Sequence, residues 1–200
     1  MRARIGLCAL VAATWMSVAR PAGAQYVEEE PDPTPFSRRH FYMGARLSGV
    51  SVVGQSGPRA FLTGGGGFDV HLGGRLSRLV AIEGAWQPTF HNEDSDYYSR
   101  ASAFGLSAFT FDLKLIATEG RVQPYAAFGL GYYMLSDRGG PFADGAGFQL
   151  GAGLDLWLAS WVSLGGRLQY RGVSLSDMEL GYDDTRLGLL YFDADLTIHF

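Results

Sequence analysis

Charged side chains recur at alternate positions in several segments, and they are the residues whose types could do chemistry. Mixed acids and bases at this spacing suit a proton or ion path, a packed network of salt bridges or, around a histidine, a metal site. The set comprises Arg46, Asp69, His71, Glu83, Asp112, Lys114, Asp155, Arg167, Arg171, Asp193, Asp195 and His199. Neither His71 nor His199 has a second histidine or a cysteine at ligand spacing. Because buried charges must be paired, salt bridging is the expected role, and no metal is expected.

Two other segments have a composition that invites a chemical interpretation. Segment 91–98 contains a histidine, a serine and several acids, but a Ser–His–acid site needs a rigid scaffold that a polar loop does not provide. The glycine run 63–67 lacks the lysine of a phosphate loop and a helix behind it. We therefore expect no catalytic residue and no cofactor. The acids of 91–98 and of 177–184 are interpreted as solvated, with Ca²⁺ binding or bridging to lipopolysaccharide left open.

The end of the chain shows the kind of element that must position these charges. Residues 190–200 alternate strictly between an apolar face, which ends at Phe200, and a face that carries Asp193, Asp195 and His199. A period of two is that of a β-strand. About 9–11 residues suffice for a tilted strand to cross a bilayer. The pattern predicts a strand with its apolar face in lipid and its charged face in the lumen of a barrel.

The same pattern recurs along the chain and predicts an all-β protein, an eight-stranded antiparallel up-and-down transmembrane barrel. The expected strands are 41–52, 61–72, 79–87, 102–116, 125–135, 148–158, 162–172 and 190–200. Longer polar connections are expected at 53–60, 88–100, 136–147 and 173–186, with short turns at the other end, as in outer-membrane barrels. Pro58, Pro88 and Pro141 are expected in the long connections and Pro124 at a strand start.

The beginning of the chain predicts export. Residues 1–24 combine Arg2 and Arg4, an apolar stretch and a small-residue ending, which is the pattern of a secretory signal peptide cleaved between Ala24 and Gln25. The acidic, proline-spaced segment 25–39 is expected to be a flexible periplasmic lead-in before a barrel over 40–200. The chain has 16 basic and 20 acidic residues, and losing the signal segment makes it more acidic. Nucleic acid is therefore excluded as a partner.

A family resemblance rests on residues 123–133 and 151–155, which are similar to recurring strand sequences of the OmpA/OmpX type of eight-stranded outer-membrane barrel. The ending Leu196, Ile198 and Phe200 resembles the signature by which such barrels are recognised for assembly. The resemblance implies the bacterial outer membrane as location and the barrel-assembly machinery, outer-membrane lipid and lipopolysaccharide as partners. Peptidoglycan anchoring is not implied. The chain also lacks the His-x-Ser pair of the lipid A deacylases.

The lumen is expected to be filled by side chains. Inward glycines at 129, 131, 151, 153 and 165 would leave room for Tyr133, Trp157, Arg167 or Arg171. The two arginines are expected to pair with Asp193 and Asp195 on the neighbouring strand.

The favoured function is that of a monomeric, non-enzymatic surface protein that acts through its extracellular loops, in adhesion or envelope integrity. Its contacts with an unknown extracellular partner would be Tyr97, Tyr98 and Tyr182. The alternative is a narrow channel or a small-ligand barrel, and a more distant one is a lipid-modifying hydrolase.

Overall fold

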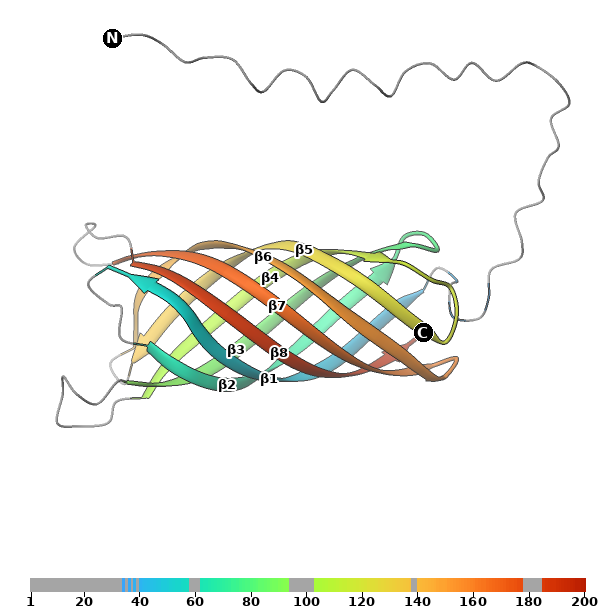
Figure 1. Ribbon diagram of the computed structural model, residues 1–200, viewed down its shortest axis with the longest axis horizontal. Coiled ribbons are helices and arrows are strands. Elements are labelled where there is room, and N and C mark those ends of the chain that lie inside the picture. Colours follow the sequence, from blue (N-terminus) through green and yellow to red (C-terminus); the bar gives the residue numbers. More distant parts are fainter. Residues whose placement is uncertain are drawn as a thin grey trace, which may run out of the picture. The chain divides into compact units, whose positions relative to one another are not determined.

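All strands in the computed structural model belong to one closed sheet, and residues 34, 36, 38, 40–57, 62–93, 103–137, 140–177 and 185–200 are described. The strands are β1 (Phe41–Ser56), β2 (Leu62–Arg75), β3 (Val80–Glu93), β4 (Ala103–Ile116), β5 (Val122–Asp137), β6 (Gly140–Ala159), β7 (Val162–Asp177) and β8 (Thr185–His199). Each is antiparallel to the strands before and after it, and all are tilted around the barrel (Figure 1). The predicted eight-stranded up-and-down barrel is confirmed.

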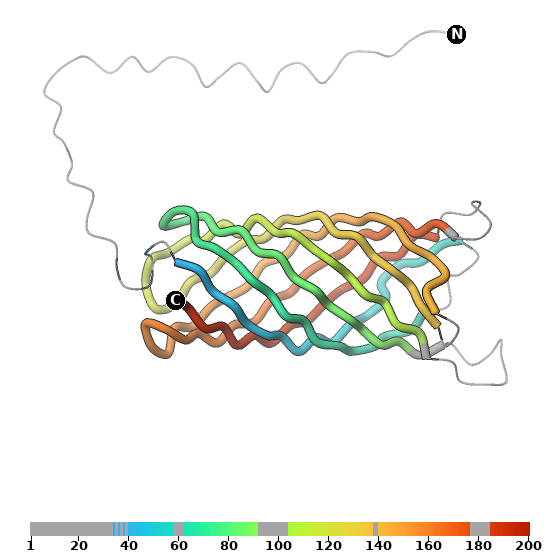
Figure 2. The backbone as a smooth tube through the Cα atoms, turned by 180° about the vertical axis from the view of Figure 1, so that it is seen from behind, coloured from blue at the N-terminus to red at the C-terminus, as the bar shows by residue number. Residues whose placement is uncertain are grey.

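The barrel closes where the first and last strands meet. Tyr42 lies opposite His199, and Arg46 lies opposite Asp195. Figure 2 shows β1 (blue) and β8 (red) with the start of one and the end of the other at the same end of the barrel. The strand ends that the two longest connections join, from β3 to β4 and from β7 to β8, lie at the opposite end. Because outer-membrane barrels keep their long loops outside the cell, we call that end extracellular and the end with Tyr42 and His199 periplasmic.

The middle of the barrel has an apolar outer face and a polar inner face. On β7, Leu168 is 48% exposed on the outside whereas its neighbour Arg167 is 6% exposed and points inward. The outward apolar band also includes Leu47, Phe109, Phe128, Leu150 and Phe192. A one-residue slip of any of these strands would place charges in lipid, so the alternation fixes the register.

Toward the extracellular end the two faces exchange character. On β7, Val173 and Leu175 are buried inside the barrel, whereas Ser174 and Ser176 are exposed. On β8, Leu187 is buried and Arg186 is exposed. The alternation continues, but its apolar half now faces inward.

The exchange of faces corrects the expected strand ends. The strands run into all four segments expected as long connections, so that 136–147 contracts to residues 138–139 between β5 and β6. Gly140, next to this turn, has a φ of 116°, a conformation that glycine adopts without strain. The polar residues that suggested loops are the outward half of strands that extend past the apolar band.

Two prolines expected in connections also lie in strands. Pro88 is inside β3, and the β2–β3 pairing is interrupted between Gly67↔Thr89 and Val70↔Trp86, where a residue without an N–H cannot complete the ladder. Pro141 is in β6 beyond the last residue pair with β7, Ala143↔Asp177, so it loses no bond on that side. Pro124 is the third residue of β5, as expected near a strand start, and Pro58 lies outside the described residues.

The described residues include no helix that is long and apolar enough to span a membrane.

Candidate functional site

Arg46 is the centre of the charged interior. Asp69 on β2 and Asp195 on β8 are its direct cross-strand neighbours. The guanidinium donates from Nη1 to Asp69 Oδ2 at 3.1 Å, from Nε to Asp195 Oδ2 at 3.3 Å, and from Nη2 to a carboxylate oxygen of Glu83 on β3. All three nitrogens are thus satisfied by acids from three strands, in a side chain that is almost fully buried.

Arg167 on β7 forms a second centre. It donates from Nε to Asp193 Oδ2 at 3.1 Å and from Nη1 to Asp112 Oδ2 at 3.2 Å. Its Nη1 also lies 3.8 Å from Glu83 Oε1. Because Glu83 contacts both arginines, the two centres form one network that crosses the lumen.

Two further predicted residues extend this network. His71 lies with Nδ1 3.2 Å from Asp69 Oδ1 and with Nε2 3.2 Å from the Thr197 hydroxyl. Lys114 donates to Asp155 Oδ2 at 2.8 Å, nearer the periplasmic end. Within the described residues, no group of three or more histidine, cysteine or acidic side chains is arranged to hold a metal ion.

Arg171 does not make the carboxylate pair expected for it. Its Nε and Nη2 lie 3.2 and 2.9 Å from the side-chain oxygen of Gln169, and its guanidinium lies 4.0 Å from the centre of the Tyr191 ring. Within the described part of the chain it has no ion pair. It is four residues beyond Arg167 on β7, where the lumen turns apolar, so an amide and an aromatic face replace acids.

Inward glycines make room for neighbours, but mostly not for the ones expected. A side chain at Gly129 would collide with Asp112, one at Gly153 with the Tyr125 ring, and one at Gly165 with Asp155 at 2.7 Å. Of the side chains expected to fill the space at these glycines, Tyr133 does so, because its ring lies against Gly131. The glycines thus create space for members of the network and for the tyrosines at its two ends.

The extracellular half of the lumen is an apolar core. Its buried members include Val50, Leu62, Leu106, Tyr133, Leu135, Leu175, Leu187, Leu189 and Tyr191. Leu135 and Leu189 have no exposed surface. The predicted charge network therefore does not extend into this half, which apolar side chains fill instead.

The periplasmic end is closed by aromatic side chains and by the start of the barrel segment. Trp157 stacks on His199 with ring centres 3.8 Å apart, and Phe36 lies 5.4 Å from the same indole. The Phe36 carbonyl accepts from Arg75 Nη1 at 2.5 Å and from Gln123 Nε2 at 3.2 Å. Phe36 falls in the segment expected as a flexible lead-in, and it is anchored here by hydrogen bonds from β2 and β5.

A chain of hydrogen bonds runs through the same end. His40 Nδ1 is 2.6 Å from the Arg38 carbonyl, so it carries a proton and donates. With both rings neutral, His199 Nδ1 then donates to His40 Nε2, and Ser163 donates to His199 Nε2, each at 2.9 Å. Burial of its ring lowers the pKa of His40, and Arg75 lowers it further, although the Arg38 carbonyl opposes this. His199 thus lies apart from the acids with which the sequence grouped it.

The serine in this chain has no room for a substrate. Ser163 is 3% exposed, and the cavity beside it measures about 20 Å³, enough for about one water molecule. Trp157, Arg75 and Lys114 are among the side chains that close this cavity. The arrangement can order the periplasmic end but cannot admit an acyl chain.

Comparison with solved structures then gives the fold its context. Outer membrane protein OprG from Pseudomonas aeruginosa is 12% identical, with a TM-score of 0.58 over 80% of this chain and 95% of that one. Neisserial surface protein A (NspA) is 16% identical, with a TM-score of 0.58 over 80% of this chain and 97% of that one. The chain has the fold of an eight-stranded outer-membrane barrel. No protein-family profile and no curated protein sequence matches it.

The end of this outer-membrane barrel is held by its backbone. The Phe200 N–H donates to the Phe41 carbonyl at 2.9 Å, and the His199 N–H donates to the Trp161 carbonyl at 2.9 Å. The Phe200 side chain is 73% exposed, whereas Ile198 and Leu196 lie on the outward face with 40% and 50% exposure. A terminal aromatic in this position is accessible from outside the barrel.

Tyr97, Tyr98 and Tyr182 lie outside the described residues, as does the signal segment. His91, expected in a loop, is instead buried in β3, where Nδ1 is 3.0 Å from the Thr63 carbonyl and Nε2 is 3.0 Å from the Thr89 hydroxyl. The run 63–67 is part of β2, and added side chains at Gly65 and Gly67 would collide with the β3 backbone.

Sequence reasoning missed several polar residues of the lumen, among them Gln149, Gln87 and Arg75. Gln149 donates to Asp112, Gln87 donates to the Ser48 hydroxyl at 2.7 Å, and Arg75 lies 5% exposed at the periplasmic end. Gln149 and Gln87 are polar residues between apolar neighbours in period-two segments, so the alternation could have found them. Arg75 lies where the expected strand had already ended.

Proposed function

We propose that this chain is a closed, non-conducting outer-membrane barrel that acts through its extracellular loops, in surface interaction, adhesion or envelope integrity. The observation that carries the proposal is the filling of the lumen. Going inward from the periplasmic end, the path meets the Trp157–His199 stack, then the Arg46–Arg167 network and then the apolar core. Eight strands enclose little more than their own side chains, so a solute path would have to displace all three layers.

The interior also supports a non-enzymatic role. Ser163 and His199 are a hydrogen-bonded serine and histidine in the described part of the chain, and the cavity beside them holds about one water molecule. A hydrolase acting on lipid would need its nucleophile on the outward face or in an open cleft. Catalysis at this pair would require the periplasmic closure to unpack.

The loops are the part of the barrel left to meet a partner. We place the contacts at Tyr97, Tyr98 and Tyr182, because tyrosines offer large, rigid contact area with a polar tip. The proposal includes a monomeric barrel, assembly by the barrel-assembly machinery, and lipopolysaccharide as the lipid around the loops.

Planar-bilayer recording of the purified barrel tests the closed lumen. We expect small and rare conductance steps, whereas large, stable channels would favour the alternative of a narrow channel. Mass spectrometry of lipid A after overexpression tests the hydrolase alternative, and unchanged lipid A is expected.

The role of the loops is tested in a deletion strain. Wild type and a variant with Tyr97→Ser, Tyr98→Ser and Tyr182→Ser are compared for attachment to surfaces and for detergent sensitivity. We expect loss of the wild-type phenotype with normal amounts of heat-modifiable barrel. Full complementation by the triple variant would contradict a role for these loops.

A further inference from the structure

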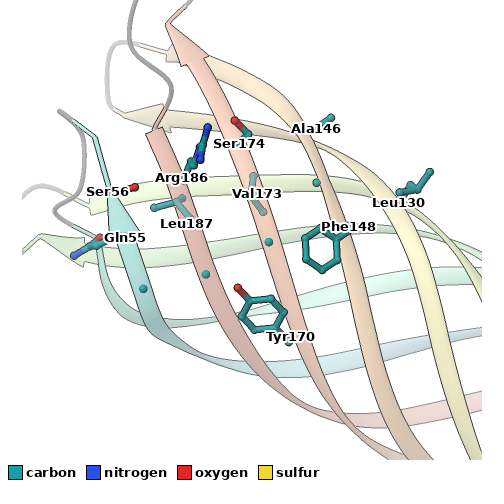
Figure 3. A pocket seen from close by; sticks show the side chains of 14 residues that line it. Gln55, Ser56, Leu130, Ala146, Phe148, Tyr170, Val173, Ser174, Arg186 and Leu187 are labelled. Atoms are coloured by element: carbon teal, nitrogen blue, oxygen red, sulfur yellow. The ribbon is translucent and has the colours of Figure 1, made fainter. Parts of the chain in front are cut away.

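An open groove of about 640 Å³ lies on the outer wall of the barrel near its extracellular end, over strands β1, β5, β6, β7 and β8. This volume is within the range of about 300–1,000 Å³ found for small-molecule sites. Figure 3 shows its lining, with Tyr170 and Phe148 toward one side and Arg186 and Ser174 toward the other.

The groove follows from one row of cross-strand neighbours. Leu130, Phe148, Gly172, Gly188 and Gly54 are paired in that order across β5, β6, β7, β8 and β1. Two large apolar side chains are thus followed by three glycines on the outer surface. The wall is thin at the glycines, and the Phe148 ring leans over Gly172 while the Tyr170 ring lies beside Gly188.

The rows on either side of the groove differ in polarity. The row toward the middle of the barrel is Phe128, Leu150, Tyr170, Leu190 and Ser51, which is mostly apolar. The row toward the extracellular end is Tyr132, Ala146, Ser174, Arg186 and Ser56, which is mostly small or polar. The groove therefore lies where the outward apolar band ends and the polar extension of the barrel begins.

Arg186 is the cationic side chain of this border. It is exposed and has small hydroxyl residues, Ser174 and Ser56, as its cross-strand neighbours on both sides. It forms no ion pair with any residue that the structure describes. An exposed guanidinium between apolar and polar zones, without an ion pair among the described residues, suits two-point contact with a phosphate.

We propose that the groove binds lipid A, with one acyl chain over Gly54 and the Phe148 and Tyr170 rings and a phosphate on Arg186. The depth of the groove matches the junction of acyl chains and headgroups, and it opens on the half of the barrel that faces the outer leaflet. A second copy of the chain is disfavoured as occupant, because a two-fold contact at this patch would bring two Arg186 side chains together. The proposal rests on the outer-membrane placement of the proposed function, but not on a closed lumen or on the loops.

A second outward groove provides a contrast. It measures about 440 Å³, lies at the periplasmic end beside Phe41, Leu72, Ile82, Phe111 and Phe200, and has no cationic side chain in its described lining. Apolar surface alone suits any acyl chain, whereas the extracellular groove combines such surface with a cation. The assignment to a phosphorylated lipid is therefore specific to the groove at Arg186.

The groove can be filled without disturbing the barrel. A side-chain carbon added at Gly54 meets no atom within 4 Å, so Gly54→Leu should project into the groove without a clash. Gly49→Leu is the matched control, because Gly49 is also outward on β1, is equally unobstructed and is not part of the groove lining. Arg186→Gln removes the phosphate contact, and Arg121→Gln, exposed at the periplasmic end, is its control.

The test is a titration of refolded, delipidated barrel in detergent with purified lipid A, followed by native mass spectrometry. We expect one tightly bound lipid A in wild type and both controls, and about tenfold weaker binding in Gly54→Leu and in Arg186→Gln. Heat-modifiable mobility of every variant shows that it is folded.

Three results would overturn the proposal. Equal lipid A affinity of the groove variants and their controls would show that lipid A does not bind in this groove. Equal affinity of wild type for phosphatidylglycerol would assign the groove to any anionic lipid, and a wild-type dimer lost in Gly54→Leu would assign it to a second copy. Conductance of the same preparations is recorded in parallel, so that an open lumen is distinguished from a failed lipid site.

Discussion

Two arginines stabilise the charged interior, because each forms ion pairs with several acids. Arg46 contacts Asp69, Glu83 and Asp195, and Arg167 contacts Asp193, Asp112 and Glu83. Removing one acid leaves an arginine with other partners, whereas removing one arginine leaves several acids without compensation. Substitutions of the arginines should therefore cost more than substitutions of the acids around them.

Arg167→Ala tests this asymmetry. The change leaves Asp193 and Asp112 buried without their cation, and breaking a buried pair typically costs about 3–5 kcal/mol. We expect a clear fall in the temperature at which the folded band is lost on unboiled gels. Asp193→Asn, which keeps the size of the side chain, should lower that temperature less.

The exposed Arg121 is the control for loss of an arginine as such. Its replacement by Ala should change the unfolding temperature little, because exposed charges contribute little to stability. Equal effects of Arg167→Ala and Arg121→Ala would show that the pairs in the lumen do not stabilise the barrel.

At the scale of elements, strict alternation predicted the existence, order and faces of all eight strands. It failed at the extracellular ends, because there it continues with its faces exchanged. In 173–176 the order Val, Ser, Leu, Ser has the same period as the lipid-facing part of β7, but the apolar residues point inward. Because the outward residues of a membrane strand are expected to be apolar, the sequence of such a segment predicts a loop.

The site could be predicted less completely than the strands. Arg167 and Asp193 are direct cross-strand neighbours, so strand order alone predicts that pair. Arg46 also lies directly between Asp69 and Asp195, but its reach to Glu83, two strands away, depends on the curvature of the barrel. The position of His199 against Trp157 and His40 was not predictable, because it depends on side chains from three segments packing at one end.

The last strand carries the prediction about assembly. Phe200 is exposed beside the start of β1 and is held by one backbone bond to Phe41. Deleting Phe200, or replacing it with Asp, should lower the amount of barrel in the outer membrane and cause degradation in the periplasm. Fractionation and immunoblotting measure both, and normal surface levels of both variants would exclude this role of the terminus.

The periplasmic closure carries a prediction about pH. His40 has a lowered pKa in the folded barrel, so the unfolded chain binds a proton more readily. Stability is therefore fully present above the ordinary histidine pKa of about 6.5 and falls as the pH drops below it. Protonated His40 would also meet the His199 Nδ1–H with a second donor and would lie near the charged Arg75.

Unfolding temperatures measured across this range test the pH effect. Wild type should lose stability on acidification, and His40→Gln should lose less, because an amide can accept from His199 without titrating. An identical pH dependence in the two proteins would assign the effect to other groups.

At the scale of the whole molecule, the same eight strands form two zones that differ in which face of the barrel is apolar. Around its middle it is a membrane protein, apolar outside and charged inside, with Leu168 outward and Arg167 inward. Near the extracellular end it resembles a water-soluble barrel, polar outside and with Leu135 and Leu189 in its core. We expect this border to lie at the level of the bilayer surface, where we also place the proposed lipid site.

Arginine substitutions along β7 test where that border lies. Leu168→Arg puts a charge in the centre of the outward apolar band, where an arginine costs about 2–4 kcal/mol. Ser176→Arg makes the same addition eight residues further along the same face of the same strand, beyond the band, where the cost should be about 0–1 kcal/mol. Folding measurements in lipid vesicles should therefore show a strong destabilisation for the first variant and nearly wild-type stability for the second. Similar losses in both would mean that the bilayer covers the polar extension, and that the exchange of faces does not mark the membrane surface.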